Sequence, residues 1–90
     1  MKINFKYFEI PTGISKKNKI SGDVRERFAD LLYLNVNGIK SHALALKIYN
    51  SDGETEFSDE EIKTIKSVAE QMCSPSFIDG LNWQLEKTEQ

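Results

Sequence analysis

The stretch Phe57-Ser58-Asp59-Glu60-Glu61-Ile62 carries the clearest structural signal in the sequence. Ser58 is followed three residues later by Glu61, which is the spacing of a capping box: the hydroxyl accepts the N3 amide, and the carboxylate accepts the N-cap amide. Phe57 and Ile62 are spaced for a hydrophobic staple, and the three acidic residues suit the first turn of a helix dipole. These signals predict a helix over residues 58–73, with a buried face made by Ile62, Ile65, Val68, Ala69 and Met72.

Three more helices are predicted around this one. Residues 75–86 follow Ser74-Pro75, a favoured pair for the N-cap and the first helical position, and Gly80 within them indicates close packing against another helix. Residues 41–50 are apolar nearly all round, which is typical of a helix at the centre of a core. Residues 23–34 follow a turn in which Ser21 or Asp23 could be the N-cap, and their apolar face contains Val24, Phe28, Leu31 and Leu32.

The N-terminal segment has the period of a strand. Ile3, Phe5 and Tyr7 alternate with polar residues, and the break at Tyr7–Phe8 indicates a β-bulge or a strand end buried on both faces. After the turn Pro11-Thr12-Gly13, residues 14–20 are predicted to return as a lysine-rich edge strand, with a plain loop as the alternative. The sequence therefore predicts an α+β, mostly helical fold: a strand or β-hairpin over residues 2–20, followed by about four helices, in one compact domain of residues 1–90.

Composition narrows the class of protein. Hydrophobic residues make up 39% of the chain and charged residues 29%, as in soluble globular domains. No apolar run approaches the roughly 20 residues that cross a bilayer, and no secretory signal is visible. Cys73 is the one cysteine, so no internal disulfide can form, and a reducing, cytoplasmic compartment is expected. No membrane partner is predicted.

No pattern of catalytic or metal-ligating residues is found. His42 stands alone at the start of an apolar segment, and Cys73 reads as a small buried hydrophobe. Residues 48–59 resemble a calcium loop if Gly53 is its sixth residue, but the first position is then Ile48, which has no oxygen ligand. We expect no enzyme activity, no metal and no cofactor.

Charge is divided unevenly along the chain. Residues 1–50 hold nine Lys/Arg against four Asp/Glu, and residues 51–90 hold three against ten, giving +5 and −7. Such asymmetry is typical either of solvated faces or of surfaces that steer a charged partner. The candidate protein-binding residues are Asp52, Glu54, Glu56, Asp59 and Glu60. The candidate basic contact surface is Lys16, Lys17, Lys19, Arg25 and Arg27.

A resemblance is carried by residues 42–49, by Asp52-Gly53, and by residues 56–62 with Ile65. Over residues 42–85 the chain resembles short proteins of uncertain role encoded by bacteriophages and prophages. The resemblance implies a viral or mobile-element origin, with the host cytoplasm or the virion as location, and assigns no role to any residue. The lysine-rich segment 14–20 has no place in that pattern.

Two classes of function remain. The first is a small non-enzymatic protein-interaction module that acts through its charged faces, either as an assembly or accessory protein that binds its own copies or as an inhibitor of a host protein. The alternative is a nucleic-acid-binding protein that uses the basic N-terminal half, although the sequence pI of about 5.4 argues against this as the main role. Trp83, Phe77 and Tyr33 are the aromatic residues to examine at an interface, with the core as the alternative place for each.

Overall fold

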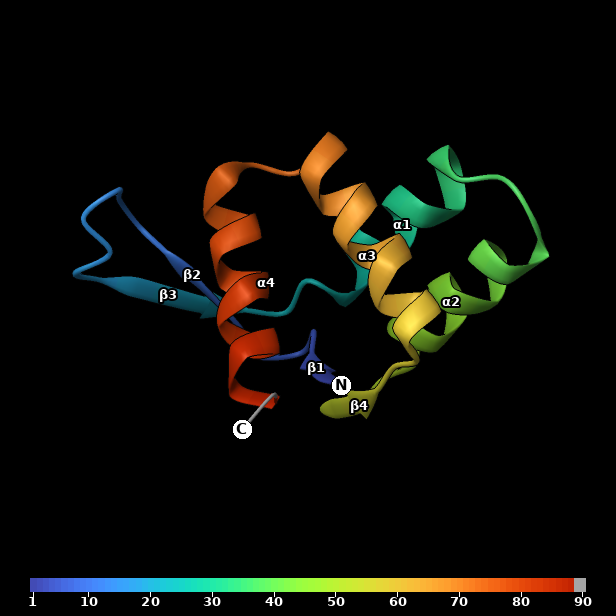
Figure 1. Ribbon diagram of the computed structural model, residues 1–90, viewed down its shortest axis with the longest axis horizontal. Helices are drawn as coiled ribbons and strands as arrows, with labels where there is room; N and C mark the ends of the chain where they lie inside the picture. The colour runs from blue at the N-terminus through green and yellow to red at the C-terminus, as the bar shows by residue number, and fades with distance from the viewer. Residues whose placement is uncertain (89–90) are drawn as a thin grey trace.

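The computed structural model describes residues 1–88. Eight elements follow one another along this part of the chain: β1 (Lys2–Asn4), β2 (Phe8–Pro11), β3 (Lys19–Gly22), α1 (Arg25–Asn35), α2 (Ile39–Tyr49), β4 (Glu54–Glu56), α3 (Asp59–Met72) and α4 (Pro75–Thr88). The predicted α+β class, with N-terminal strands followed by four helices, is confirmed. Figure 1 shows the β2–β3 hairpin at one end of the long axis and the α1–α2 pair at the other, with α3 and α4 between them.

The predicted strand over residues 2–10 is in fact two strands in different sheets. The Asn4 side chain ends β1, because its Oδ1 accepts hydrogen bonds from the backbone amides of Lys6 and Tyr7, both at 3.0 Å. The chain turns there, so Phe5 and Phe8 are both buried while Tyr7 is 65% exposed. A local side-chain hydrogen bond therefore explains the broken alternation, and no bulge is needed.

The predicted hairpin is confirmed, with a longer loop than expected. β2 pairs antiparallel with β3, and Ile10 lies opposite Ile20. Only Lys19 and Ile20 of the predicted return segment 14–20 belong to the strand. The amide of Thr12 bonds the carbonyl of Asn18 at 3.0 Å and closes the loop.

One strand was not predicted. β4 lies within the acidic segment and pairs antiparallel with β1, so that Ile3 faces Thr55. Glu, Thr and Glu give no apolar strand signal. The position of β4 depends instead on β1, which is more than fifty residues away in the sequence.

A cluster of phenylalanine rings joins the strands to the helices. Phe8 stacks on Phe77 of α4 with ring centroids 4.5 Å apart, and Phe77 stacks on Phe28 of α1 at 5.6 Å. Phe5 meets Phe57 edge to face at 5.9 Å. Phe77, one of the aromatic residues considered for an interface, thus belongs to this stacked cluster.

The predicted N-terminal signal is confirmed for α3, whereas α1 and α2 begin at other residues than predicted. The capping box of α3 is confirmed: the Glu61 amide donates to Ser58 Oγ at 3.1 Å, and the Ser58 amide donates to Glu61 Oε1 at 2.8 Å. α2 begins two residues earlier than expected, after Gly38 at φ 109°, and Ser41 is buried inside it. α1 begins at Arg25, whose amide bonds Asp23 Oδ1 at 3.1 Å, although the N-cap position itself is Val24.

Two predictions about buried faces are wrong. Met72 is 44% exposed, because it occupies the last position of α3. α2 is not the centre of the core. Only Ser41, Leu44, Ala45 and Ile48 are buried, and its other side is open to solvent at the end of the molecule.

Candidate functional site

The open side of α2 is apolar. Ile39, His42, Ala43, Leu46 and Tyr49 are all exposed, and their spacing of three and four residues places them on one helix face, called here the outer face of α2. Ile39 is 88% exposed, Leu46 50% and Tyr49 53%. The two lysines of α2 turn to α3 instead, since Lys40 binds Glu60 at 3.1 Å and Lys47 binds Glu61 at 3.0 Å. The outer face of α2 therefore carries no ion pair and no lysine.

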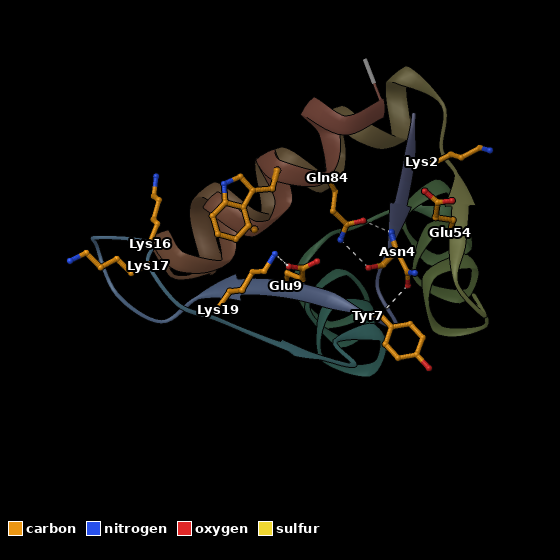
Figure 2. A pocket seen from close by; sticks show the side chains of 11 residues that line it. Lys2, Asn4, Tyr7, Glu9, Lys16, Lys17, Lys19, Glu54 and Gln84 are labelled. Carbon is orange, nitrogen blue, oxygen red and sulfur yellow. Dashed lines mark hydrogen bonds and ion pairs between the residues drawn. The ribbon is translucent and has the colours of Figure 1, made fainter. Parts of the chain in front are cut away.

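A second surface is a groove of about 720 Å³ between the hairpin, α4 and the β1–β4 pair, called here the hairpin groove. Figure 2 shows Lys16, Lys17 and Lys19 on the hairpin side and Lys2 and Glu54 on the side of β1 and β4. Its complete lining is Lys2, Asn4, Tyr7, Glu9, Lys16, Lys17, Lys19, Glu54, Gly80, Trp83 and Gln84.

One face of α4 builds the groove. Gly80, Trp83 and Gln84 are three and four residues apart, so they project on the same side. A Cβ on Gly80 would overlap the carbonyl oxygen of Glu9 and come within 2.9 Å of the Phe8 ring. The predicted close packing at Gly80 is real, but the partner is strand β2 rather than a helix.

Gln84, on this same face of α4, links the helix to strand β1. Its side-chain amide pairs with the backbone of Asn4 in both directions: Oε1 accepts the Asn4 amide at 2.6 Å, and Nε2 donates to the Asn4 carbonyl at 3.0 Å. This is the pattern of one rung of a β-ladder. α4 thereby occupies part of the edge of β1 that β4 leaves free (Figure 2).

The three hairpin lysines are held differently. Lys16 has φ 58°, a left-handed conformation that costs a non-glycine residue about 1–2 kcal/mol, and its ammonium lies 3.6 Å from Asp79 of α4. Lys19 forms an ion pair with Glu9 on the neighbouring strand. Lys17 has no ion pair with any residue that the structure describes. Among the three hairpin lysines, Lys17 is thus the one that can meet a ligand without breaking an ion pair within residues 1–88.

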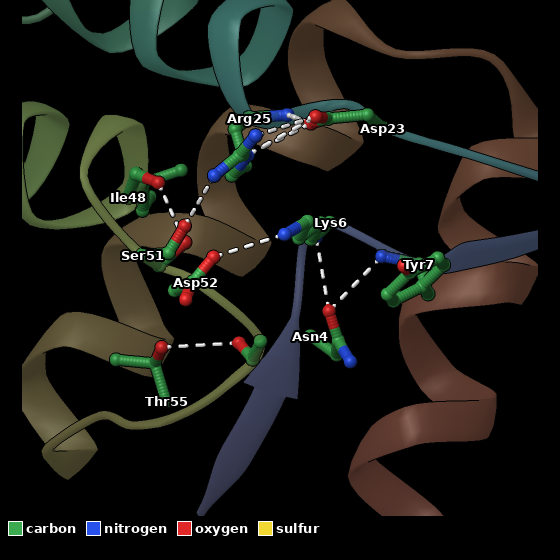
Figure 3. A network of polar contacts seen from close by, with 10 residues as sticks. Asn4, Lys6, Tyr7, Asp23, Arg25, Ile48, Ser51, Asp52 and Thr55 are labelled. Carbon is green, nitrogen blue, oxygen red and sulfur yellow. Dashed lines mark hydrogen bonds and ion pairs between the residues drawn. The ribbon is translucent and has the colours of Figure 1, made fainter.

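Arg25 belongs to a structural network, although the sequence placed it in a basic contact surface. It binds Asp23 through Nε at 3.0 Å and Nη2 at 2.7 Å, and it donates through Nη1 to the Ser51 carbonyl at 2.6 Å (Figure 3). The hydrogen bond from Arg25 holds the pKa of the Asp23 carboxyl below its usual value. Arg27, exposed on α1, lies outside both the network and the groove lining.

The acidic candidates are dispersed over several elements. Asp52 binds Lys6 at 2.9 Å, and this hydrogen bond lowers the pKa of Asp52. Glu56 binds the ammonium of Met1 at 3.1 Å, and Glu60 binds Lys40. Glu54 faces the groove, while Asp59 is exposed in the first turn of α3 without an ion pair to any residue of the described range 1–88.

Folding therefore brings the two oppositely charged halves of the chain together. Ion pairs between residues 1–50 and residues 51–90 are Met1–Glu56, Lys6–Asp52, Lys16–Asp79, Lys40–Glu60 and Lys47–Glu61. Much of the separation seen along the sequence disappears in space. The acidic segment as a whole is a weaker candidate for steering a partner than its composition indicates.

His42 and Cys73 lie on different elements, and neither lines the hairpin groove. His42 is on the outer face of α2, with its ring centroid 5.8 Å from that of Tyr33, which is 63% exposed on α1. Cys73 follows α3, and burial raises the pKa of its thiol. Within residues 1–88 no group of three His, Cys, Asp or Glu side chains is arranged to hold a metal ion. In the same range, no helix has the length and apolar character that spanning a bilayer requires.

Several residues of the two surfaces were missed by sequence reasoning. Leu46 and Tyr49 were assigned to a buried helix over residues 41–50, and Ile39 lay outside the predicted helix. The surplus of apolar residues around residues 41–50 was itself the signal of a second, open face. Tyr7 was expected on the apolar side of a strand. Gln84 gave no signal, because its partner is the backbone of a residue eighty positions away.

Comparisons with protein-family models, with curated proteins and with solved structures found no match to this chain.

Proposed function

We propose that the protein is a non-enzymatic protein-interaction module that binds through the outer face of α2. The observation that carries this proposal is that α2 is apolar on two sides and the domain covers only one of them. A helix that is hydrophobic all round is normally buried on every side. Here the second side would be buried by another protein.

The composition of the surface supports a protein partner. Leu46 and Ile39 are flanked by Tyr49, and Tyr33 of α1 extends the surface across His42. Tyrosine offers a large apolar area with a polar tip and is enriched among the residues that dominate binding energy. Clustered exposed apolar side chains of this kind are typical of contact sites on soluble domains.

The partner proposed is a second copy of the chain. Tyr49 at the C-terminal end of α2 shares a surface hollow with Asp23, Arg25 and Glu26, and Ile39 is exposed at the N-terminal end. An antiparallel pair of α2 helices would bury the apolar outer face of each copy against that of the other, with Ile39 of one near Tyr49 of its partner. The partly positive N-terminus of each helix would also lie near the partly negative C-terminus of the other, which is a favourable arrangement of the two helix dipoles. Such a contact is isologous and closes as a dimer.

This proposal moves the contact away from the charged faces expected from the sequence. Asp52, Glu56 and Glu60 already have intramolecular partners, and Asp59 and Glu54 are left as acids that could influence approach. An assembly role would suit the phage-encoded proteins that residues 42–85 resemble. The charged residues would then tune the rate of association rather than supply the contact.

The test is the absolute mass in solution, measured by light scattering after size exclusion at about 50 mM and 500 mM salt. An apolar contact should give the dimer mass at both salts, because screening weakens only charge-driven association. Leu46→Glu should give the monomer mass. Ile14→Glu is the matched control, since Ile14 is fully exposed and lies in the hairpin loop far from α2.

Three results would contradict the proposal. Wild-type protein that stays monomeric at about 500 μM rules out a second copy on α2. A dimer that dissociates at high salt points to the charged faces instead. A dimer that Leu46→Glu leaves intact places the contact elsewhere.

A further inference from the structure

The hairpin groove combines positive charge with aromatic surface, and α2 contributes nothing to it. Lys2, Lys16, Lys17 and Lys19 line the groove from three separate segments, together with the carboxylates of Glu9 and Glu54. Trp83 and Tyr7 contribute rings, and Tyr7 is 65% exposed. Lysines that share a groove with an exposed ring and a half-buried one match the two parts of a nucleotide chain, its phosphates and its bases.

We propose that the hairpin groove binds single-stranded nucleic acid, with bases stacking on Trp83 and phosphates meeting Lys16, Lys17 and Lys19. A single strand can place unstacked bases on an aromatic side chain, whereas a duplex keeps its bases stacked on one another. The volume of about 720 Å³ suits a few nucleotides rather than a duplex. An acidic peptide would use the lysines and leave both rings without a role.

The positions of the lysines favour a ligand that follows the groove. Lys16 of the loop forms an ion pair with Asp79 of α4, and Lys19 on β3 forms one with Glu9. Both lysines are fixed by these contacts, while Lys17 has no ion pair within residues 1–88. Lys17 is therefore the residue whose removal tests the ligand without disturbing the fold.

The net charge of −2 limits the strength of this interaction. Affinity should come from the local lysines alone and should fall with salt as they release counterions from the strand. Three phosphate contacts on a single strand give a slope of about −2 in log K against log salt concentration. Dissociation constants of about 10⁻⁴ to 10⁻⁶ M are expected, as for sequence-independent binding.

Trp83 makes the groove directly observable, because it is the only tryptophan of the chain. An eight-nucleotide oligothymidylate titrated at about 50 mM salt should quench its fluorescence. Lys17→Ala should weaken binding and reduce the salt slope by about 0.7. Lys66→Ala is the matched control, because Lys66 is exposed on α3 outside the groove lining, and it should bind like the wild type.

A second pair of variants tests stacking, followed by anisotropy of a labelled oligonucleotide. Trp83→Ala should bind about 5- to 100-fold more weakly, which corresponds to one lost stacked base, and Trp83→Phe should recover part of the loss. Circular dichroism melts establish that each variant is folded. Because the Lys17 measurement stands independently, the proposal remains testable even if Trp83→Ala unfolds.

Four outcomes would overturn the proposal. One is the absence of quenching by the oligonucleotide at about 50 mM salt, and another is Lys17→Ala binding as tightly as Lys66→Ala. Equal competition by poly-glutamate of matched charge would identify an acidic peptide as the ligand class. Equal affinity for a duplex would exclude base stacking in the groove.

Discussion

The carbonyl oxygen of Glu9 occupies the space in which a side chain at position 80 would begin, so β2 rests directly on the backbone of α4 at Gly80. Glycine inside a helix normally costs about 1 kcal/mol relative to alanine. At this position the cost is offset because the missing side chain lets β2 pack directly against α4. This contact fixes the position of the hairpin and forms one end of the groove.

Gly80→Ala is expected to destabilise the protein by about 1–3 kcal/mol, as overpacking of a close contact does, despite the better helix propensity of alanine. Urea unfolding measures the change. Gly22→Ala is the control, because no atom lies within 4 Å of the position of its Cβ. A gain of stability in Gly80→Ala would mean that β2 does not press on α4.

Gln84→Ala should lose about 1–2 kcal/mol, since the partly buried amide and carbonyl of Asn4 would each lose a hydrogen-bond partner. Amide hydrogen exchange at Asn4 should accelerate at the same time. Gln71→Ala, at an exposed position of α3, provides the comparison. If both variants have the same free energy of unfolding, the hydrogen bonds between Gln84 and Asn4 do not contribute to stability.

Ser58→Ala should cost about 1 kcal/mol, the usual value for an N-cap, because the Glu61 amide loses its acceptor. Ser58→Gly should cost only a few tenths. Thermal melts of these variants beside Ser67→Ala, exposed in the middle of α3, separate the cap from a general effect of removing a hydroxyl. Equal melting temperatures for the alanine variants would exclude a contribution of the capping box.

Stability should fall in acid. Burial acts to raise the pKa of Glu61, but hydrogen bonds from the Ser58 backbone and from Lys47 bring it below its usual value; the pKa values of Asp23 and Asp52 are lowered by Arg25 and Lys6. A carboxyl whose pKa is lower in the folded state stabilises the fold above its unfolded pKa, near pH 4. That contribution disappears as the pH falls through the folded value.

Urea unfolding between about pH 6 and pH 2.5 should therefore show a steep loss below pH 4, and Asp52→Asn should make it shallower. Asp30→Asn, on the exposed side of α1 and outside the network of Figure 3, is the control. An unchanged acid slope in Asp52→Asn would show that its ion pair with Lys6 does not contribute to stability in solution.

Local signals allowed most of the helices to be predicted. The capping box at Ser58 and the pair Ser74-Pro75 act over one helical turn, so a sequence window contains all of their partners. β4 and Gln84 could not be found in this way, because their partners are backbone atoms of β1. The sequence showed that residues 41–50 are apolar nearly all round, and this was interpreted only as burial within the domain.

The candidate sites were predicted less well for a related reason. Charge counted along the sequence does not show that Asp52 meets Lys6 or that Glu60 meets Lys40. Lys16, Lys17 and Lys19, grouped from the sequence as part of a basic contact surface, all line the hairpin groove. Their aromatic neighbour Trp83 comes from the last helix, and only the packing at Gly80 brings it beside them.

The contacts of β1 also determine when the chain can finish folding. Asn4 is bounded by Glu54 of β4 on one edge and by Gln84 on the other. During synthesis, β1 can pair with β4 and Phe5 can contact Phe57 once residues 54–57 have been made, but Gln84 and the ring of Phe77 that stacks on Phe8 follow later. The edge of β1 that faces α4 is thus completed only after residue 84 has been made, and a fragment that ends before Gln84 leaves the amide and carbonyl of Asn4 without these partners.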